Sequence, residues 1–223
     1  MHPPRQDVHG ITIYTALSTG GVRSFSSQVL RKLVDLLPSL KIVMEHITTK
    51  QGVEFVQNAR DGVAGTMTVQ HLMLNRNALF SHKGVGGLRP HHYCLPVLKR
   101  EEHRRALVAA ATSGSRKFFA GTDSAPHPQD KKESPCGCAG CFTAPAALEL
   151  YAQVFEQEGA LDRLEAFTST NGADFYGIPR NARRVRLVKE SWTLPTSFQV
   201  EGIATGVVPL CAGEEVPWKA TLI

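Results

Sequence analysis

The residues of this sequence that could do chemistry gather between Gly121 and Cys141, in the stretch GTDSAPHPQDKKESPCGCAGC. Asp123 and His127 offer a carboxylate and an imidazole. Three thiols follow in the same stretch, those of Cys136, Cys138 and Cys141. Two kinds of site are therefore open: a small thiolate-zinc module, or part of an active site lined by oxygen and nitrogen atoms.

The three thiols have the spacing of a zinc knuckle, C-x-C-x-x-C, but a structural zinc site needs four ligands. A fourth thiol would have to come from Cys94 or Cys211, and neither belongs to a paired motif. The alternative is that the three cysteines are small packing residues in a tight, glycine-rich loop. The sequence favours this second interpretation.

Polar residues end three of the predicted strands. Glu45-His46 ends the first, Gln70-His71 the second, and Asp123 with His127 follows the third. In parallel α/β folds the working groups project from the carboxyl ends of strands. Neutral imidazoles and a carboxylate can hold Zn²⁺ with one position open for water, and an Asp beside that water can carry its proton. The pattern thus predicts metal-assisted hydrolysis, although each His could instead be a hydrogen-bonded residue at the start of a loop.

The elements that position these residues alternate between short apolar runs and longer helical stretches, which is typical of βα units around a parallel sheet. We predict strands over 40–47, 62–72 and 117–120. We predict helices over 28–37, 50–58, 96–113, 144–157 and 161–169, and short strands from Val185 to the end. The fold class is therefore α/β.

The composition suits one soluble globular domain over residues 1–223, with 42% hydrophobic residues and a net charge of +5. The basic residues are scattered, so nucleic-acid binding is not expected. No apolar run approaches the roughly 18 residues of a membrane span, and the opening MHPPRQDVHG lacks the features of a signal peptide. Five cysteines, an odd number, indicate a reducing compartment, and we expect the cytoplasm.

Longer strings identify a family. EHITTK (45–50), QHLMLNRN (70–77), RPHHYCLPVLKR (89–100), GTDSAPH (121–127) and KESPCGCAGCF (132–142) together resemble the dihydroorotases of the single-function bacterial type, in the amidohydrolase superfamily. NGADFYGIP (171–179) and the closing CAGEEVPWK are also similar to that family. The resemblance runs from about Leu40 to the C-terminus.

The resemblance implies a TIM-barrel-like, metal-dependent hydrolase fold, here an incomplete barrel containing the last strands. It implies a centre with two Zn²⁺ ions, for which His46 is a ligand from the sixth strand. Asp123 would bind the other zinc and act as general acid and base. His9, in the string VHG, resembles the fifth-strand ligand, although the residues before it are not an apolar strand.

The reaction implied is the reversible cyclisation of N-carbamoyl-L-aspartate to (S)-dihydroorotate, a step of pyrimidine biosynthesis. His127 and the backbone of Leu95 and Ala139 would contact this small anionic substrate. The glycines of the GCAGC loop would let its backbone shape the pocket. A homodimer is possible.

The sequence also departs from the family pattern. The H-x-H pair of the first strand, the substrate-holding Arg and Asn, the carboxylated Lys and a mobile loop are missing, and residues 1–24 are atypical. Two functions stay open: a dihydroorotase, which could be truncated, or a non-catalytic remnant that acts as an interaction or regulatory partner. We expect little or no dihydroorotase activity from the isolated chain, because the bridging Lys and two His ligands are absent.

Overall fold

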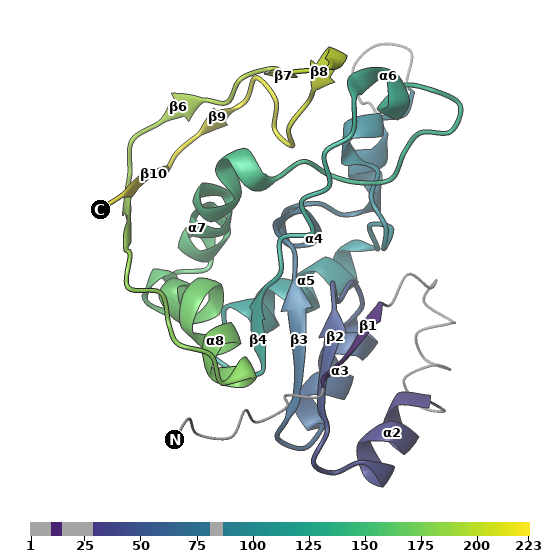
Figure 1. Cartoon of the computed structure of the whole chain (residues 1–223), viewed down its shortest axis with the longest axis vertical. Coiled ribbons are helices and arrows are strands. Elements are labelled where there is room, and N and C mark those ends of the chain that lie inside the picture. The colour runs from purple at the N-terminus through teal and green to yellow at the C-terminus, as the bar shows by residue number, and fades with distance from the viewer. Residues whose placement is uncertain (1–9, 15–28, 81–86) are drawn as a thin grey trace, which may run out of the picture.

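The computed structural model describes residues 10–14, 29–80 and 87–223, with the backbone alone for 10–14. The predicted ligand His9 lies outside the described residues. Four parallel strands form the central sheet, in the order β1-β2-β3-β4 (Figure 1). They are β1 (Gly10–Tyr14), β2 (Lys41–Glu45), β3 (Val63–Met67) and β4 (Phe118–Ala120).

Helices connect and follow the strands, as expected for parallel neighbours that need crossover connections. The α-helices are α2 (Arg31–Leu36), α3 (Lys50–Asn58), α4 (Val69–Met73), α5 (Glu101–Ala111), α6 (Gln129–Lys132), α7 (Ala147–Gln157) and α8 (Asn171–Tyr176). Single turns of 3-10 helix occupy Arg76–Leu79, Pro90–His92, Ala144–Ala146 and Leu161–Arg163, and a π-helix spans Ala166–Thr170. The predicted α/β fold, part of a TIM-barrel-like sheet, is confirmed.

The two faces of the sheet pack against different partners because side chains alternate along a strand. Met44 and Phe118 belong to the main core, which also takes in residues of α3, α5 and α7. Val43, Ala64 and Phe119 form a smaller cluster, against which Phe175 and Tyr176 pack from α8. All five residues of β3 are buried, so the strand is covered on both faces.

A C-terminal arm, residues 185–222, follows α8 and consists of short strands paired two by two. The strands are β5 (Val185–Val188), β6 (Trp192–Thr193), β7 (Phe198–Val200), β8 (Ile203–Val207), β9 (Glu215–Val216) and β10 (Lys219–Leu222). The antiparallel pairs are β5 with β10, β6 with β9, and β7 with β8. The short strands predicted from Val185 onward are thus present. Figure 1 shows the arm running beside α7 toward α6.

The predicted second strand, 62–72, is too long. The strand ends at Met67, and Thr68 then begins helix α4, because its side-chain oxygen accepts a hydrogen bond from the backbone N–H of His71 at 3.3 Å. Gln70 and His71 therefore lie on a helix and not at the end of a strand. The predicted helix 96–113 begins only at Glu101.

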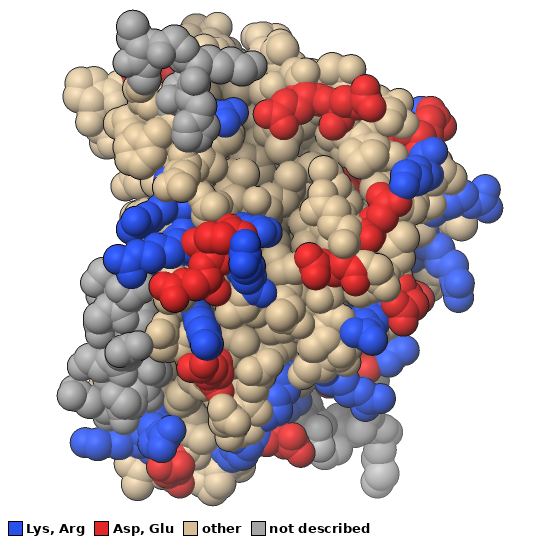
Figure 2. Space-filling view, turned by 180° about the vertical axis from the view of Figure 1, so that it is seen from behind, with Lys and Arg blue, Asp and Glu red and all other residues tan. Residues whose placement is uncertain are grey.

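Charges on the surface are mixed. Figure 2 shows Lys and Arg interspersed with Asp and Glu over one face of the molecule, without a large area of a single sign. Within the described part of the chain, no helix has both the length and the apolar character needed to cross a membrane.

Candidate functional site

His46 and Asp123 meet at the carboxyl edge of the sheet. His46 directly follows β2, and Asp123 comes three residues after β4. His46 Nδ1 and Asp123 Oδ2 are 3.5 Å apart. Both residues have positive φ angles, 50° and 44°, a region that is uncommon for residues other than glycine and that is concentrated at functional sites. The chain thus turns sharply at both strand ends and brings the two side chains together.

Thr66 of β3 lies between these two strand ends and holds His46 in place. Its Oγ1 accepts a hydrogen bond from the backbone N–H of His46 at 2.8 Å. Gly121 allows the close approach from the other side, since a Cβ there would lie 2.7 Å from Thr66 Cβ. The backbone just after β4 therefore lies close against the Thr66 side chain, which is the side chain that bonds the backbone of His46.

The site concentrates negative charge around one imidazole. His46 is buried, with Nε2 at 3.7 Å from Glu45 Oε2 and Nδ1 facing Asp123. Burial raises the pKa of Asp123 above its ordinary value, and the charge of His46 opposes that shift. A carboxyl group shifted in this direction is better able to take up and release a proton than an exposed one.

The predicted substrate contacts lie in neighbouring loops. His127 Nε2 and the carbonyl oxygen of Ala139 are 3.0 Å apart, and because a carbonyl can only accept, Nε2 carries the proton of this bond. Leu95 is 47% exposed. The loops that carry Leu95 and Ala139 are joined by a hydrogen bond of 2.9 Å from the N–H of Gly140 to the carbonyl of Tyr93. His127, Ala139 and the loop of Leu95 are thus connected.

The cysteines do not form a metal site in the described part of the chain. Cys136 is exposed, Cys138 and Cys211 are half-buried, and Cys94 and Cys141 are buried, all with free thiols. No group of three or more His, Cys, Asp or Glu side chains among the described residues could hold a metal ion. Of the three clustered cysteines, Cys141 is buried in the core, whereas Cys136 is exposed, so the packing interpretation describes Cys141 but not Cys136.

The same finding limits the predicted zinc centre. His46 and Asp123 supply two donors, whereas a catalytic zinc has three protein ligands. The residues that the structure describes therefore do not complete a zinc site by themselves.

His71 and Gln70, the strand-end candidates of the second predicted strand, do not join this site. His71 is buried on α4, where its two ring nitrogens contact Thr68 Oγ1 at 2.6 Å and the Pro96 carbonyl at 2.7 Å. Sequence reasoning missed Thr66, which positions His46. The only signal for it is a polar residue near the end of an otherwise small and apolar strand.

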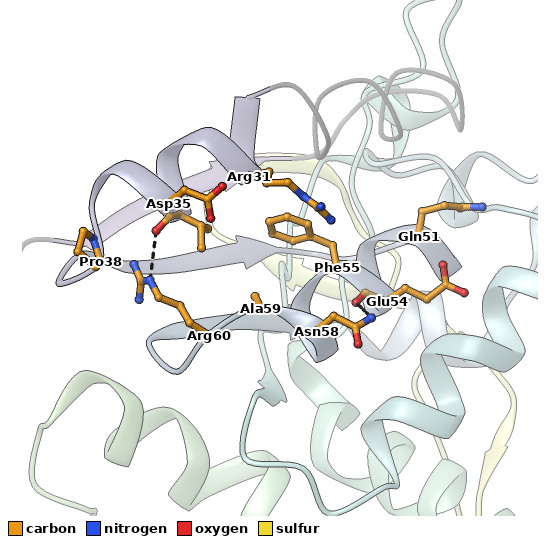
Figure 3. Close-up of a pocket in the computed structure, with 10 residues that line it drawn as sticks. Arg31, Asp35, Pro38, Gln51, Glu54, Phe55, Asn58, Ala59 and Arg60 are labelled. Atoms are coloured by element: carbon orange, nitrogen blue, oxygen red, sulfur yellow. Dashed lines mark hydrogen bonds between the residues drawn. The ribbon is translucent and has the colours of Figure 1, made fainter.

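A cavity of about 640 Å³ lies away from the candidate site, between α2 and α3 (Figure 3). Phe55 lies among its lining residues, and Arg60 donates from Nε to the carbonyl of Val34 across it at 3.3 Å. Charged side chains of both signs line it, including Arg31, Asp35 and Glu54. None of the residues that line this cavity belongs to the His46–Asp123 site.

Comparison with known proteins identifies the class. The amidohydrolase family pattern matches residues 12–187, and the chain belongs to this family. Among curated relatives, the dihydroorotase of Shewanella amazonensis is 60% identical over 197 residues, which are 88% of this chain and 56% of that protein. The dihydroorotase of Nitrosomonas europaea is 57% identical over 213 residues, 95% of this chain and 59% of that protein. The resemblance to dihydroorotases is thus confirmed, and the chain spans a little over half the length of these relatives.

Solved structures agree. The dihydroorotase from Saccharomyces cerevisiae in complex with 5-fluoroorotic acid superimposes with a TM-score of 0.79 at 32% identity, covering 90% of this chain and 56% of that one. The dihydroorotase from Campylobacter jejuni gives 0.78 at 33% identity, with 89% and 56% covered. The L-hydantoinase from Arthrobacter aurescens shares the fold, with a TM-score of 0.71 at 16% identity.

Proposed function

We propose that this chain forms part of the active site of a dihydroorotase, which reversibly cyclises N-carbamoyl-L-aspartate to (S)-dihydroorotate in de novo pyrimidine biosynthesis. The observation that carries the proposal is the pair His46–Asp123, held 3.5 Å apart at the carboxyl ends of β2 and β4. Relatives with 57–60% identity are named dihydroorotase, which supports the same reaction.

Asp123 is the proposed general acid and base. Opening the dihydroorotate ring requires water to lose a proton as it attacks the carbonyl carbon, and the departing amide nitrogen to gain one. Asp123 takes the first proton and returns it to the nitrogen, so the carboxylate is regenerated after each cycle. Its partly buried position beside His46 is suited to this exchange.

His127, with the backbone of Leu95 and Ala139, forms the proposed binding site for the anionic substrate. Because Nε2 of His127 donates to the carbonyl of Ala139, the atom left to meet a substrate carboxylate is Nδ1. Nδ1 is a donor only when the ring is protonated. The bond to Ala139 then fixes the direction in which this donor points.

Zinc is the expected cofactor. His46 and Asp123 are its proposed ligands, with His9 as a further candidate outside the described residues. Since the described donors fall short of a complete site, zinc binding by this chain requires additional ligands.

Binding of dihydroorotate tests the proposal. We expect saturable binding to the full chain by isothermal titration calorimetry with zinc supplied, weakened at least tenfold in His127→Ala. Arg186→Ala removes an exposed charge in the C-terminal arm and should bind like the unchanged protein. Absence of any binding to the unchanged chain would refute the proposed function.

Turnover separates the enzyme from the non-catalytic partner. Ring opening of dihydroorotate is followed by its ultraviolet absorbance, again with zinc supplied. Turnover that disappears in Asp123→Asn identifies a working enzyme and contradicts the expectation of little activity. Binding without turnover favours the interaction partner, and sedimentation velocity of the same sample shows whether the chain is a monomer or a homodimer.

A further inference from the structure

Lys132 is a buried lysine in the middle of the candidate site's loops. It ends the short helix α6 and is only 3% exposed, the lowest exposure of any lysine that the structure describes. Its neighbour Lys131 has a side chain that is 63% exposed. Lysine is almost never fully buried unless its charge is paired or hydrogen-bonded, so the position of Lys132 calls for a physical reason.

Three carbonyl oxygens surround its ammonium group. Lys132 Nζ donates to the carbonyls of Tyr93 at 2.9 Å, Cys138 at 2.6 Å and Gly140 at 2.7 Å. An ammonium group has three N–H donors, and each of them has an acceptor here. The nitrogen also lies 5.7 Å from the centre of the Tyr93 ring, which adds a cation–π contact. These contacts are with three backbone carbonyls and one aromatic ring, and none of them is with a carboxylate.

These carbonyls belong to the two loops that carry the proposed substrate contacts. Tyr93 precedes Leu95 by two residues, and Cys138 and Gly140 flank Ala139 on both sides. A trans peptide unit is planar, with its C=O and N–H pointing in opposite directions. When Lys132 binds the carbonyl of Cys138, the N–H of Ala139 must therefore point away from the lysine. The bond to the Gly140 carbonyl fixes the peptide between Gly140 and Cys141 in the same way.

Other contacts hold the remaining sides of this loop. The carbonyl of Ala139 faces His127 Nε2, and a Cβ at Gly140 would lie 2.7 Å from Ala125 Cβ, so the loop is pressed against the segment between Asp123 and His127. The Gly140 N–H already joins the two loops through one hydrogen bond to the Tyr93 carbonyl. Lys132 adds three more from a single ammonium group, to Tyr93 on one loop and to Cys138 and Gly140 on the other.

We infer that Lys132 is a positioning residue for substrate binding, which fixes the backbone of Ala139 and the loop of Leu95 by donating to three carbonyls. This inference rests on the proposed function for the identity of the substrate. The geometric part, that Lys132 holds the 138–140 loop, does not depend on it.

The test compares Lys132→Met with Lys131→Met in the full chain. Methionine keeps much of the side-chain volume and removes the donors, while the matched change at the exposed neighbour removes a charge from the same helix. Amide hydrogen exchange of the peptide 136–142, measured by mass spectrometry, should be at least tenfold faster in Lys132→Met and unchanged in Lys131→Met. Dihydroorotate affinity should fall at least tenfold in Lys132→Met alone.

A general loss of stability must be told apart from this local effect. Val56→Ala removes buried methyl groups from α3, outside the candidate site, and serves as a destabilised control. It should lower the melting temperature without weakening dihydroorotate binding. Lys132→Arg restores donors in a planar arrangement and should recover part of the affinity.

The outcomes separate the two claims. Unchanged exchange of the 136–142 peptide in Lys132→Met overturns the positioning role, whatever the substrate. Faster exchange with unchanged dihydroorotate affinity also overturns it, because the loop would then be irrelevant to binding. If the unchanged chain binds no dihydroorotate, the proposed function fails, and the exchange result alone decides whether Lys132 holds the loop.

Discussion

His71 illustrates how a single residue that looks catalytic in the sequence can be structural. Its Nε2 donates to the carbonyl of Pro96, which can only accept, so the neutral ring carries its proton on Nε2 and accepts from the Thr68 hydroxyl through Nδ1. Both nitrogens are thus used within the fold. Burial lowers the pKa of His71 from 6.5 to about 4, although the bond to Pro96 acts in the opposite direction.

We therefore predict that His71 makes the fold sensitive to acid. Below about pH 6.5 the unfolded chain takes up a proton at this position, whereas the folded chain stays neutral there until about pH 4, so stability falls as the pH falls through this window. Over the whole window the free energy of unfolding should fall by roughly 3 kcal/mol. Urea unfolding at a series of pH values should show a shallower loss for His71→Gln than for the unchanged chain.

Arg186→Gln serves as the control, because it introduces the same side chain at an exposed position of β5 and removes no histidine or carboxylate. It should keep the acid-dependent slope of the unchanged chain over pH 6.5 to 4. Equal slopes for the unchanged chain and His71→Gln would show that this histidine does not cause the acid sensitivity.

At the scale of the elements, a strand could be predicted where burial on both faces requires an unbroken run of apolar residues. The run Ile42–Met44 is apolar because β2 is covered on both faces, and it marks the strand within a few residues. The prediction made the second strand too long because the sequence TMTVQHL continues the alternation of the strand, although Thr68 caps a helix there. The alternation of apolar and polar residues is the same before and after Thr68, so periodicity cannot show where the strand ends. The hydrogen bond to the Thr68 side chain starts the helix there.

Gly121, directly after β4, lies close to Thr66 of β3, and this close approach leads to a prediction about the two strands. Gly121→Ala would place a methyl group 2.7 Å from Thr66 Cβ and force the two strands apart. We expect a loss of about 1–3 kcal/mol in the free energy of unfolding. Weaker dihydroorotate binding should accompany it, because Thr66 holds the backbone of His46.

Gly172→Ala is the matched glycine for this comparison. It lies within α8, where the nearest atom to a new Cβ is in the Phe119 ring at 3.3 Å. Alanine also favours a helix over glycine by up to about 1 kcal/mol, so the change should be close to neutral. The interpretation of Gly121 fails if the two variants have the same stability in chemical denaturation.

At the scale of the whole molecule, the candidate site could be predicted only in part. The pair His46 and Asp123 could be predicted because each residue follows a strand, and parallel strands bring their carboxyl ends to one edge of the sheet. The role of Lys132 could not be predicted, since its bond to Tyr93 spans 39 residues, and the string KESPCGCAGCF that begins with it does not show that its side chain is buried. Contacts between loops depend on the tertiary fold, which a motif cannot supply.

The C-terminal arm is held to the sheet domain by side chains of α7. The buried Glu149 accepts a hydrogen bond at 3.1 Å from the backbone N–H of Ala220, and Glu156 accepts one at 3.0 Å from Trp218 Nε1. The backbone carbonyl of Trp218 in turn accepts a hydrogen bond from Trp192 Nε1 at 2.8 Å. The two tryptophans of the chain both lie in the arm, so their fluorescence reports whether it is docked.

We predict that Glu149→Ala loosens the arm while the sheet stays folded. The N–H of Ala220 loses its acceptor, at a cost of about 1–3 kcal/mol. On heating, tryptophan emission should shift to the red at a lower temperature than the loss of helical circular dichroism, whereas in the unchanged chain both transitions coincide.

Glu149→Gln keeps a carbonyl acceptor and should behave almost like the unchanged chain. Glu190→Ala removes only the exposed pair with Lys219 and should do the same. Coincident transitions in Glu149→Ala would mean that apolar packing, and not this buried carboxylate, docks the arm.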